Sequence, residues 1–110
     1  MEGFNAKAIV FNKTSSGWKS DEVILKSVGD LRGVFSPYIN DVEQVNLSLH
    51  EKVYYSLSFL RDNIHAKVTD EMGNRHFMVS PILVVLCDDT KPINITEDSL
   101  NFFKEAIDFC

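Results

Sequence analysis

The sequence predicts an α+β fold: an antiparallel β-sheet of about five or six strands, an N-terminal-half helix, and a C-terminal helix packed on one face. Three observations lead to this prediction. Apolar and polar residues alternate with period two in the middle of the chain, as in half-buried strands. The run from Ile82 to Cys87 is apolar throughout, which is typical of a central strand. Residues 96–110 repeat apolar side chains at helical spacing.

The composition fits one globular domain over residues 1–110, because 45% of the residues are hydrophobic and 25% are charged. The first residues lack the basic and apolar regions of a signal peptide. The apolar run at 82–87 is too short for a bilayer, which needs about 20 residues. Cys87 and Cys110 are expected to be free thiols. The sequence therefore predicts a cytoplasmic protein that does not enter a membrane.

The N-terminal third is expected to hold one strand and one helix. Residues 6–13 are rich in β-forming side chains, and polar residues at 14–17 predict a loop. Ser20 is suited to cap a helix over 20–36, which Pro37 would end. Two internal glycines weaken this prediction. The helical spacing is formed by Ile24, Val28, Leu31 and Phe35.

The middle of the chain predicts consecutive antiparallel strands. Residues 45–49, 53–59 and 64–69 each alternate apolar and polar side chains, so each strand would bury one face. The turn-forming residues at 61–63 are suited to join the second and third segments. These three segments are therefore expected to be neighbours in one sheet.

A hairpin is expected around the turn at 71–74. If the turn centres on its middle two residues, Val68 lies opposite Phe77 and Asp70 lies opposite Arg75. This register satisfies apolar packing and charge pairing together. It also places both histidines of the hairpin on the outward face.

The C-terminal segment is expected to form a loop and a helix. Pro81 should lie at a strand start or an edge, and residues 88–92 should form a loop. Thr96 is suited to cap the last helix, with acidic residues in the first turn. Two neighbouring stripes make an unusually wide apolar face: Leu100, Phe103, Ile107 and Cys110, and Phe102, Ala106 and Phe109.

Charge is distributed unevenly. The formal net charge is -5, and residues 88–110 hold six acids against two bases, whereas the first 87 residues hold ten acids and nine bases. Such asymmetry favours a basic partner and disfavours direct binding of nucleic acid, which needs clustered Lys and Arg. The alternative is that these acids only keep a C-terminal helix soluble. The six acids are Asp88, Asp89, Glu97, Asp98, Glu105 and Asp108.

No catalytic or metal-binding constellation can be assigned. His50, His65 and His76 lack a cysteine or carboxylate at ligand spacing, so no metal or other cofactor is expected. No nucleophile elbow or phosphate-binding glycine run occurs. Cys87 lies in an apolar run, where burial suppresses thiolate formation. The best enzyme-like signal is Asp88-Asp89 after a strand, joined by Asp41 and Glu43 if the fold brings them near.

Aromatic residues provide possible anchors for a partner. Trp18 is the single Trp, and Tyr54 lies on the polar side of its strand beside two serines. The alternative for Tyr54 is burial beneath a second helix. We therefore expect a partner-binding surface made of the six C-terminal acids, with Trp18 and Tyr54 as aromatic anchors.

The sequence favours a small acidic, non-catalytic protein-binding domain. It would neutralise or inhibit a basic protein, such as a toxin or a nuclease, as immunity proteins, antitoxins and phage-type inhibitors do. One alternative is a structural or homo-oligomerising subunit, with the wide apolar face of residues 100–110 as a homodimer seam. Another is a carboxylate enzyme built on Asp88 and Asp89. The sequence neither indicates nor excludes small-ligand sensing.

Overall fold

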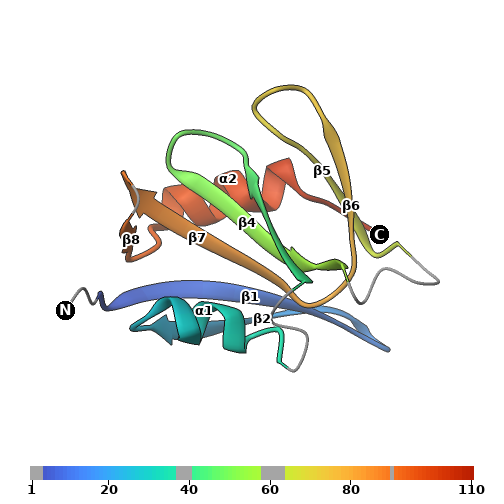
Figure 1. Ribbon diagram of the computed structural model, residues 1–110. Coiled ribbons are helices and arrows are strands. Elements are labelled where there is room, and N and C mark those ends of the chain that lie inside the picture. Colours follow the sequence, from blue (N-terminus) through green and yellow to red (C-terminus); the bar gives the residue numbers. More distant parts are fainter. Residues whose placement is uncertain (1–3, 37–40, 58–63, 90) are drawn as a thin grey trace.

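The computed structural model describes residues 4–36, 41–57, 64–89 and 91–110, and the fold is mixed α+β (Figure 1). Its elements are β1 (Ala6–Thr14), β2 (Gly17–Leu25), α1 (Val28–Gly33), β3 (Val42–Asn46), β4 (Glu51–Ser56), β5 (Ala66–Thr69), β6 (Arg75–Met78), β7 (Ile82–Asp88), β8 (Lys91–Ile93), α2 (Glu97–Ala106) and β9 (Asp108–Phe109).

The main sheet, sheet A, has six antiparallel strands in the order β2-β1-β7-β4-β3, with β8 also paired to β7. The prediction for residues 82–87 is confirmed: β7 lies between β1 and β4, and every residue from Ile82 to Cys87 is buried. The strand predicted at 6–13 is also confirmed as β1. Pro81 follows a cis peptide bond immediately before β7 begins, at a strand start as expected.

The helix predicted over 20–36 is wrong in its first part. Residues 17–25 form β2, which pairs with β1 over nine residue pairs, from Thr14↔Gly17 to Ala6↔Leu25. This long-range pairing stabilises a strand more than the helical spacing of the apolar residues stabilises a helix, which two glycines already weaken. Of the apolar residues that suggested the helix, Ile24 and Val28 are more than half exposed, whereas Leu31 and Phe35 are buried.

A shorter helix, α1, begins after Ser27 and not after Ser20. The Ser27 hydroxyl accepts a hydrogen bond from the Asp30 amide at 3.1 Å, and the Asp30 carboxylate accepts one from the Lys26 amide at 2.9 Å. Such reciprocal bonds satisfy backbone donors that a helix N-terminus leaves free. The cap therefore determines where α1 starts.

The predicted hairpin forms, but in a second sheet and in a different register. Sheet B has the order β6-β5-β9, so β5 does not pair with β4. The residues expected to join these two strands, 61–63, lie outside the described residues. Observed partners are Val68↔His76 and Lys67↔Phe77, one residue away from the prediction. Phe77 is consequently 42% exposed, and His76 shares the inner face with Val68.

The register shift has a local cause at Asp70. The Asp70 amide donates to the carbonyl of Asn74 at 2.8 Å, so the loop holds three residues, and Gly73 takes a positive φ of 88°. The Asp70 carboxylate accepts bonds from the Met72 and Asn74 amides instead of pairing with Arg75. Side-chain capping of this kind is a turn preference of aspartate.

The C-terminal helix α2 runs back along β7. Thr96 caps it by accepting a hydrogen bond from the Ser99 amide, and Glu97 and Asp98 occupy its first turn. The helix ends at Ala106, earlier than the apolar stripes suggest. The next residues form β9, which pairs with β5 at Ala66↔Phe109.

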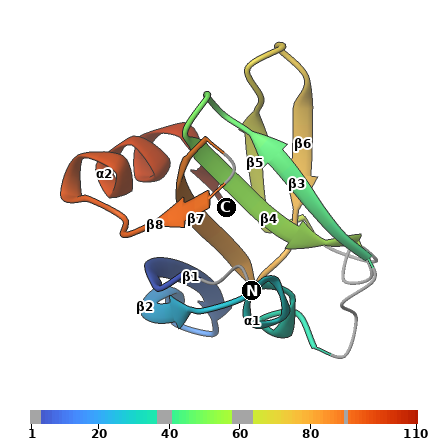
Figure 2. The same ribbon diagram turned by 60° about the vertical axis from the view of Figure 1, so that its left-hand side comes forward.

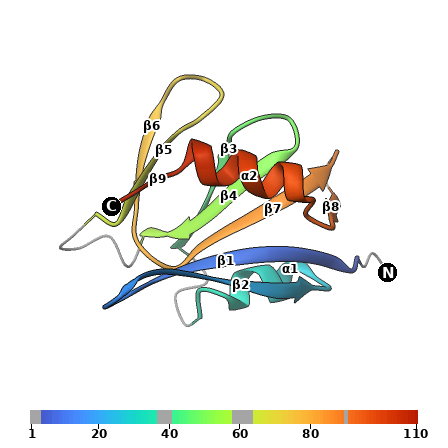
Figure 3. The same cartoon turned by 180° about the vertical axis from the view of Figure 1, so that it is seen from behind.

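Two apolar clusters lie on opposite faces of sheet A. One contains Phe103 and Ile107 of α2 together with Val53 and Val84 of the sheet, and residues of sheet B complete it. The other lies under α1 and contains Phe35 with neighbouring strand residues such as Leu83. Figures 2 and 3 show α1 and α2 on opposite sides of β7. Of the wide apolar face, Phe103 and Ile107 are buried, whereas Phe102 stays 38% exposed. The homodimer seam stays a prediction.

Candidate functional site

Four of the six predicted acids gather at one end of the molecule. Asp88 ends β7, Asp89 follows it, and Glu97 and Asp98 begin α2. The loop predicted at 88–92 is wrong at both ends, because Asp88 pairs with Lys91 and Cys87 pairs with Pro92 in the ladder between β7 and β8. The first turn of α2 reaches the same end, because Ser99 Oγ lies 3.5 Å from Glu51 Oε2 on the strand beside β7. All four carboxylates are exposed. Within the described ranges, none of the four forms an ion pair. We call these four residues the acidic end.

The other two predicted acids lie elsewhere. Glu105 is in the last turn of α2, and Asp108 belongs to β9, which pairs with β5. A ten-residue helix is about 15 Å long. Glu105 and Asp108 are therefore separated from the acidic end by roughly the length of α2 (Figure 3).

Trp18 lies near Asp108 and far from the acidic end. Its ring packs against Phe109 with 4.9 Å between centroids, and its indole nitrogen donates to the Cys110 carbonyl at 3.1 Å. His65 meets the same ring edge-on at 6.3 Å. These contacts hold β9 against sheet A. Trp18 and the acidic end cannot belong to one compact contact surface.

Tyr54 lies on the opposite face of sheet A from α2, in the cluster under α1. Its hydroxyl donates to Gln44 Oε1 at 3.1 Å. Burial, and secondarily the charge that Cys87 would carry, raise the pKa of Tyr54 to about 12. The phenol is therefore neutral at physiological pH. Tyr54 is partly buried, so it lies between the two expectations of an exposed anchor and a side chain buried beneath a helix.

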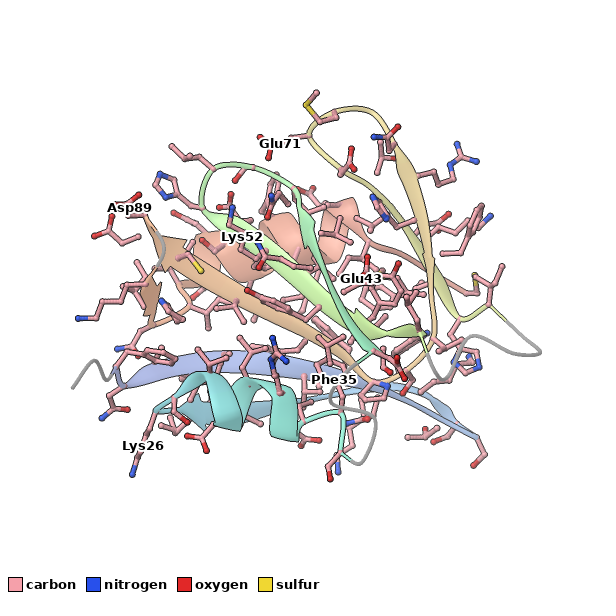
Figure 4. All side chains as sticks on the ribbon, in the orientation of Figure 1. Lys26, Phe35, Glu43, Lys52, Glu71 and Asp89 are labelled. Carbon is pink, nitrogen blue, oxygen red and sulfur yellow. The ribbon has the colours of Figure 1, made fainter. Side chains whose placement is uncertain are left out.

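The carboxylate cluster proposed for an enzyme does not form with Glu43. Glu43 pairs with Tyr55, toward the start of β7, whereas Asp88 and Asp89 lie at its other end. Figure 4 shows Glu43 and Asp89 well apart. In the part of the chain that the structure describes, no three His, Cys, Asp or Glu residues are grouped to hold a metal ion.

The three histidines have separate structural partners. His50 Nδ1 lies 2.9 Å from the Cys87 carbonyl, and His65 Nδ1 accepts a hydrogen bond from the Ser80 amide. His76 was predicted to face outward, which is wrong: its Nε2 lies 2.8 Å from an Asp70 carboxylate oxygen. The one-residue register shift brings these two side chains to the same side of the hairpin.

The Asp70–His76 contact predicts an acid-sensitive contribution to stability. The hydrogen bond from His76, with those from the Asn74 and Met72 amides, lowers the pKa of Asp70 below its ordinary value. Its stabilising effect is thus complete above the unfolded-state pKa of about 4 and disappears as pH falls through the lower folded-state pKa. The free energy of unfolding, measured with urea, should fall less between neutral and acidic pH in Asp70→Asn than in the native chain. Equal losses in both proteins would contradict this.

One cleft was not expected from the sequence. A cavity of about 530 Å³ lies between α1 and sheet A. Its lining is mostly apolar, with two cations at the rim and polar groups from the strands: Phe4, Val28, Leu31, Arg32, Val42, Gln44, Tyr54, Cys87, Lys91 and Pro92. Alternation along each strand indicates which side chains point to the same face, and this signal could have grouped Gln44, Tyr54 and Cys87. The sequence held no signal that α1 lies over that face.

Cys87 forms part of the cleft floor and is 4% exposed. Burial raises the pKa of its thiol, an effect that the Lys52 ammonium partly opposes. A protonated, buried thiol is a poor nucleophile. The expectation that Cys87 acts as a small buried side chain is confirmed by its burial. Cys87 and Cys110 are both free thiols in the structure, as predicted.

Among the described residues, neither helix is long and apolar enough to cross a membrane. Comparison of the chain with protein-family models, with curated proteins and with solved structures gave no match.

Proposed function

We propose that this chain is a small acidic protein-binding domain that neutralises or inhibits a basic protein partner, as immunity proteins, antitoxins and phage-type inhibitors do. The observation that supports the proposal most directly is the acidic end, where four exposed carboxylates gather from the end of β7, the residue after it and the start of α2. None of them has an ion-pair partner among the described residues. Carboxylates that only needed solvent could be spread over the surface. Their gathering produces a local negative field suited to a basic surface.

The first experiment identifies the partner. The tagged chain is used to capture proteins from a lysate of its own organism at low and at moderate salt. A single stoichiometric basic protein that is lost as the salt concentration rises is expected, because screening shortens the Debye length from about 30 Å at 0.01 M to about 8 Å at 0.15 M. Recovery of the chain alone, at a mass above that of the monomer, would favour the homo-oligomerising subunit instead.

Two matched variants then test the site. The first neutralises the acidic end with Asp88→Asn, Asp89→Asn, Glu97→Gln and Asp98→Asn. The second makes the same charge change elsewhere with Asp21→Asn, Glu22→Gln, Glu105→Gln and Asp108→Asn. Stopped-flow association with the captured partner at low salt should slow about tenfold for the first variant and much less for the second, because steering depends on local potential.

Asparagine is suited to position 89, because Asp89 has a positive φ of 61° that Asn tolerates. At this position the substitution therefore adds no backbone strain. Because Glu97 and Asp98 lie in the first turn of α2, circular dichroism is used to verify that the first variant keeps its helix. Equal association rates for the two variants would show that only the total charge matters and that the acidic end is not the contact surface.

A further inference from the structure

The cleft between α1 and sheet A exists because α1 is short. Six helical residues extend about 9 Å, which is too short to cover the face of a six-stranded sheet. Leu31 and Phe35 attach the helix to the cluster beneath it. On the side of α1 toward β3, β4 and β8, the described lining of the hollow includes Val42, Tyr54 and Lys91. The result is a hollow with an ordered floor and two walls.

The dimensions and lining of the cleft are those of a small-molecule site. Its volume of about 530 Å³ lies within the range of roughly 300–1,000 Å³ that ligand pockets occupy. Apolar side chains from α1, β3 and β8 line it, including Leu31, Val42 and Pro92, together with Phe4, which precedes β1. A few polar groups among mainly apolar walls orient a bound molecule. The walls therefore suit an apolar ligand body.

The charged groups of the lining have one sign. Arg32 from α1 and Lys91 from β8 contribute cations, and none of the lining residues within the described ranges carries a carboxylate. Both side chains are exposed, and in the described ranges neither forms an ion pair. Lys91 lies opposite Asp88 in the ladder between β7 and β8, so the acidic end adjoins this part of the rim. Arg32 lies on α1, a separate element, and is the cation of the lining that has no acid of the acidic end as its strand partner.

Polar groups on the strand wall complete the site. The Tyr54 hydroxyl donates a hydrogen bond to Gln44 Oε1, and Gln44 Nε2 donates one to Asn46 Oδ1 at 2.8 Å. The two hydrogen bonds therefore run in the same direction along the three side chains. The Tyr54 oxygen keeps acceptor capacity toward the cleft. Lys52, labelled on β4 in Figure 4, lies near enough to Cys87 to influence its thiol. The same side of the molecule therefore carries a third cation.

We propose that this cleft binds a small organic acid, a molecule with an apolar body and one anionic group. The apolar body contacts the walls formed by α1, β3 and β8, and the anionic group interacts with Arg32 and Lys91 at the rim. Arginine suits this role because its planar guanidinium binds the oxygens of carboxylate, sulfonate or phosphate groups in a fork. This binding site uses other residues than the proposed protein contact, and the two adjoin where Lys91 pairs with Asp88 of the acidic end.

A matched pair of fluorescent probes tests the proposal. Anilinonaphthalene sulfonate carries the anionic group, and phenylnaphthylamine has the same aromatic body without it. The native chain should bind one sulfonate probe per molecule, about tenfold more tightly than the neutral amine. Chemical-shift changes of the backbone amides should be confined to cleft residues. Equal affinity for the two probes, shifts elsewhere, or no binding would each overturn the proposal.

Single charge removals locate the anionic group. Arg32→Gln and Lys91→Gln should each lower the affinity for the sulfonate probe by about threefold to tenfold. Each should change the affinity for the neutral probe less than twofold. Lys26→Gln is the control, because it removes the same charge from a side chain that points away from the cleft in Figure 4. If Lys26→Gln lowers the affinity for the sulfonate probe as much as Arg32→Gln does, the cations of the cleft have no specific role and the proposal fails.

Discussion

Phe103→Ala is expected to lower the free energy of unfolding by about 3–5 kcal/mol. Phe103 is 0% exposed and is the aromatic side chain by which α2 packs against sheet A. Its removal takes away buried apolar surface and leaves a cavity that a close-packed core fills only in part. A domain of this size has about 5–15 kcal/mol of stability in total, so the variant should be close to unfolding. Urea denaturation measures the loss.

The adjacent phenylalanine provides the control. Phe102 is 38% exposed, and its ring meets that of Phe103 at 6.1 Å between centroids. Each substitution removes this shared contact and makes the same change in helix propensity, so the difference between them reports burial. Phe102→Ala should lower the free energy of unfolding by less than about 1 kcal/mol. Similar losses for the two variants would show that α2 does not pack through Phe103.

Phe35→Ala is expected to detach α1 and to cost about 3–5 kcal/mol. Phe35 is 0% exposed and follows α1 by two residues, within the cluster on the other face of sheet A. Since α1 has only six residues, its own hydrogen bonds cannot hold it without this packing. Urea denaturation gives the global loss. Faster hydrogen exchange of the Leu31 amide, which bonds to the Ser27 carbonyl, reports the loosening of α1.

Val34→Ala is the matched control, because Val34 is the neighbouring residue and is only partly buried. It should leave the exchange rate of α1 nearly unchanged. Phe35→Ala should also lower the affinity for the sulfonate probe, since α1 supplies one wall of the cleft. Unchanged exchange of the Leu31 amide in Phe35→Ala would contradict the view that this ring anchors the helix.

Elements with strong local signals could be predicted from the sequence. The apolar run at 82–87 requires burial on both faces, and that requirement alone identifies a central strand. Thr96 followed by two acids at the next positions specifies a helix start, because capping involves only neighbouring backbone groups. Period-two alternation predicted strands at 45–49 and 53–59. The structure has an antiparallel pair with shifted bounds, β3 (Val42–Asn46) and β4 (Glu51–Ser56), because residues 47–50 form the bend between them.

Elements that depend on distant partners were mispredicted. β2 forms because β1 offers nine pairing residues, an interaction that no window around residues 17–25 contains. The hairpin register was wrong by one residue because Asp70 caps its own loop rather than pairing with Arg75. With period two, this single shift exchanges the faces of Phe77 and His76.

The acidic C-terminal region was visible in the sequence as an excess of carboxylates over bases. Only the tertiary structure decided that four of them share one end, because α2 runs back along β7 and carries Glu105 and Asp108 to the other. The cleft was beyond prediction, since Arg32, Tyr54 and Lys91 belong to three elements brought together by folding. The sequence by itself determined local structure, burial and charge composition. The tertiary structure decided which charges meet, because the proximity of distant residues arises only from long-range strand pairing and packing.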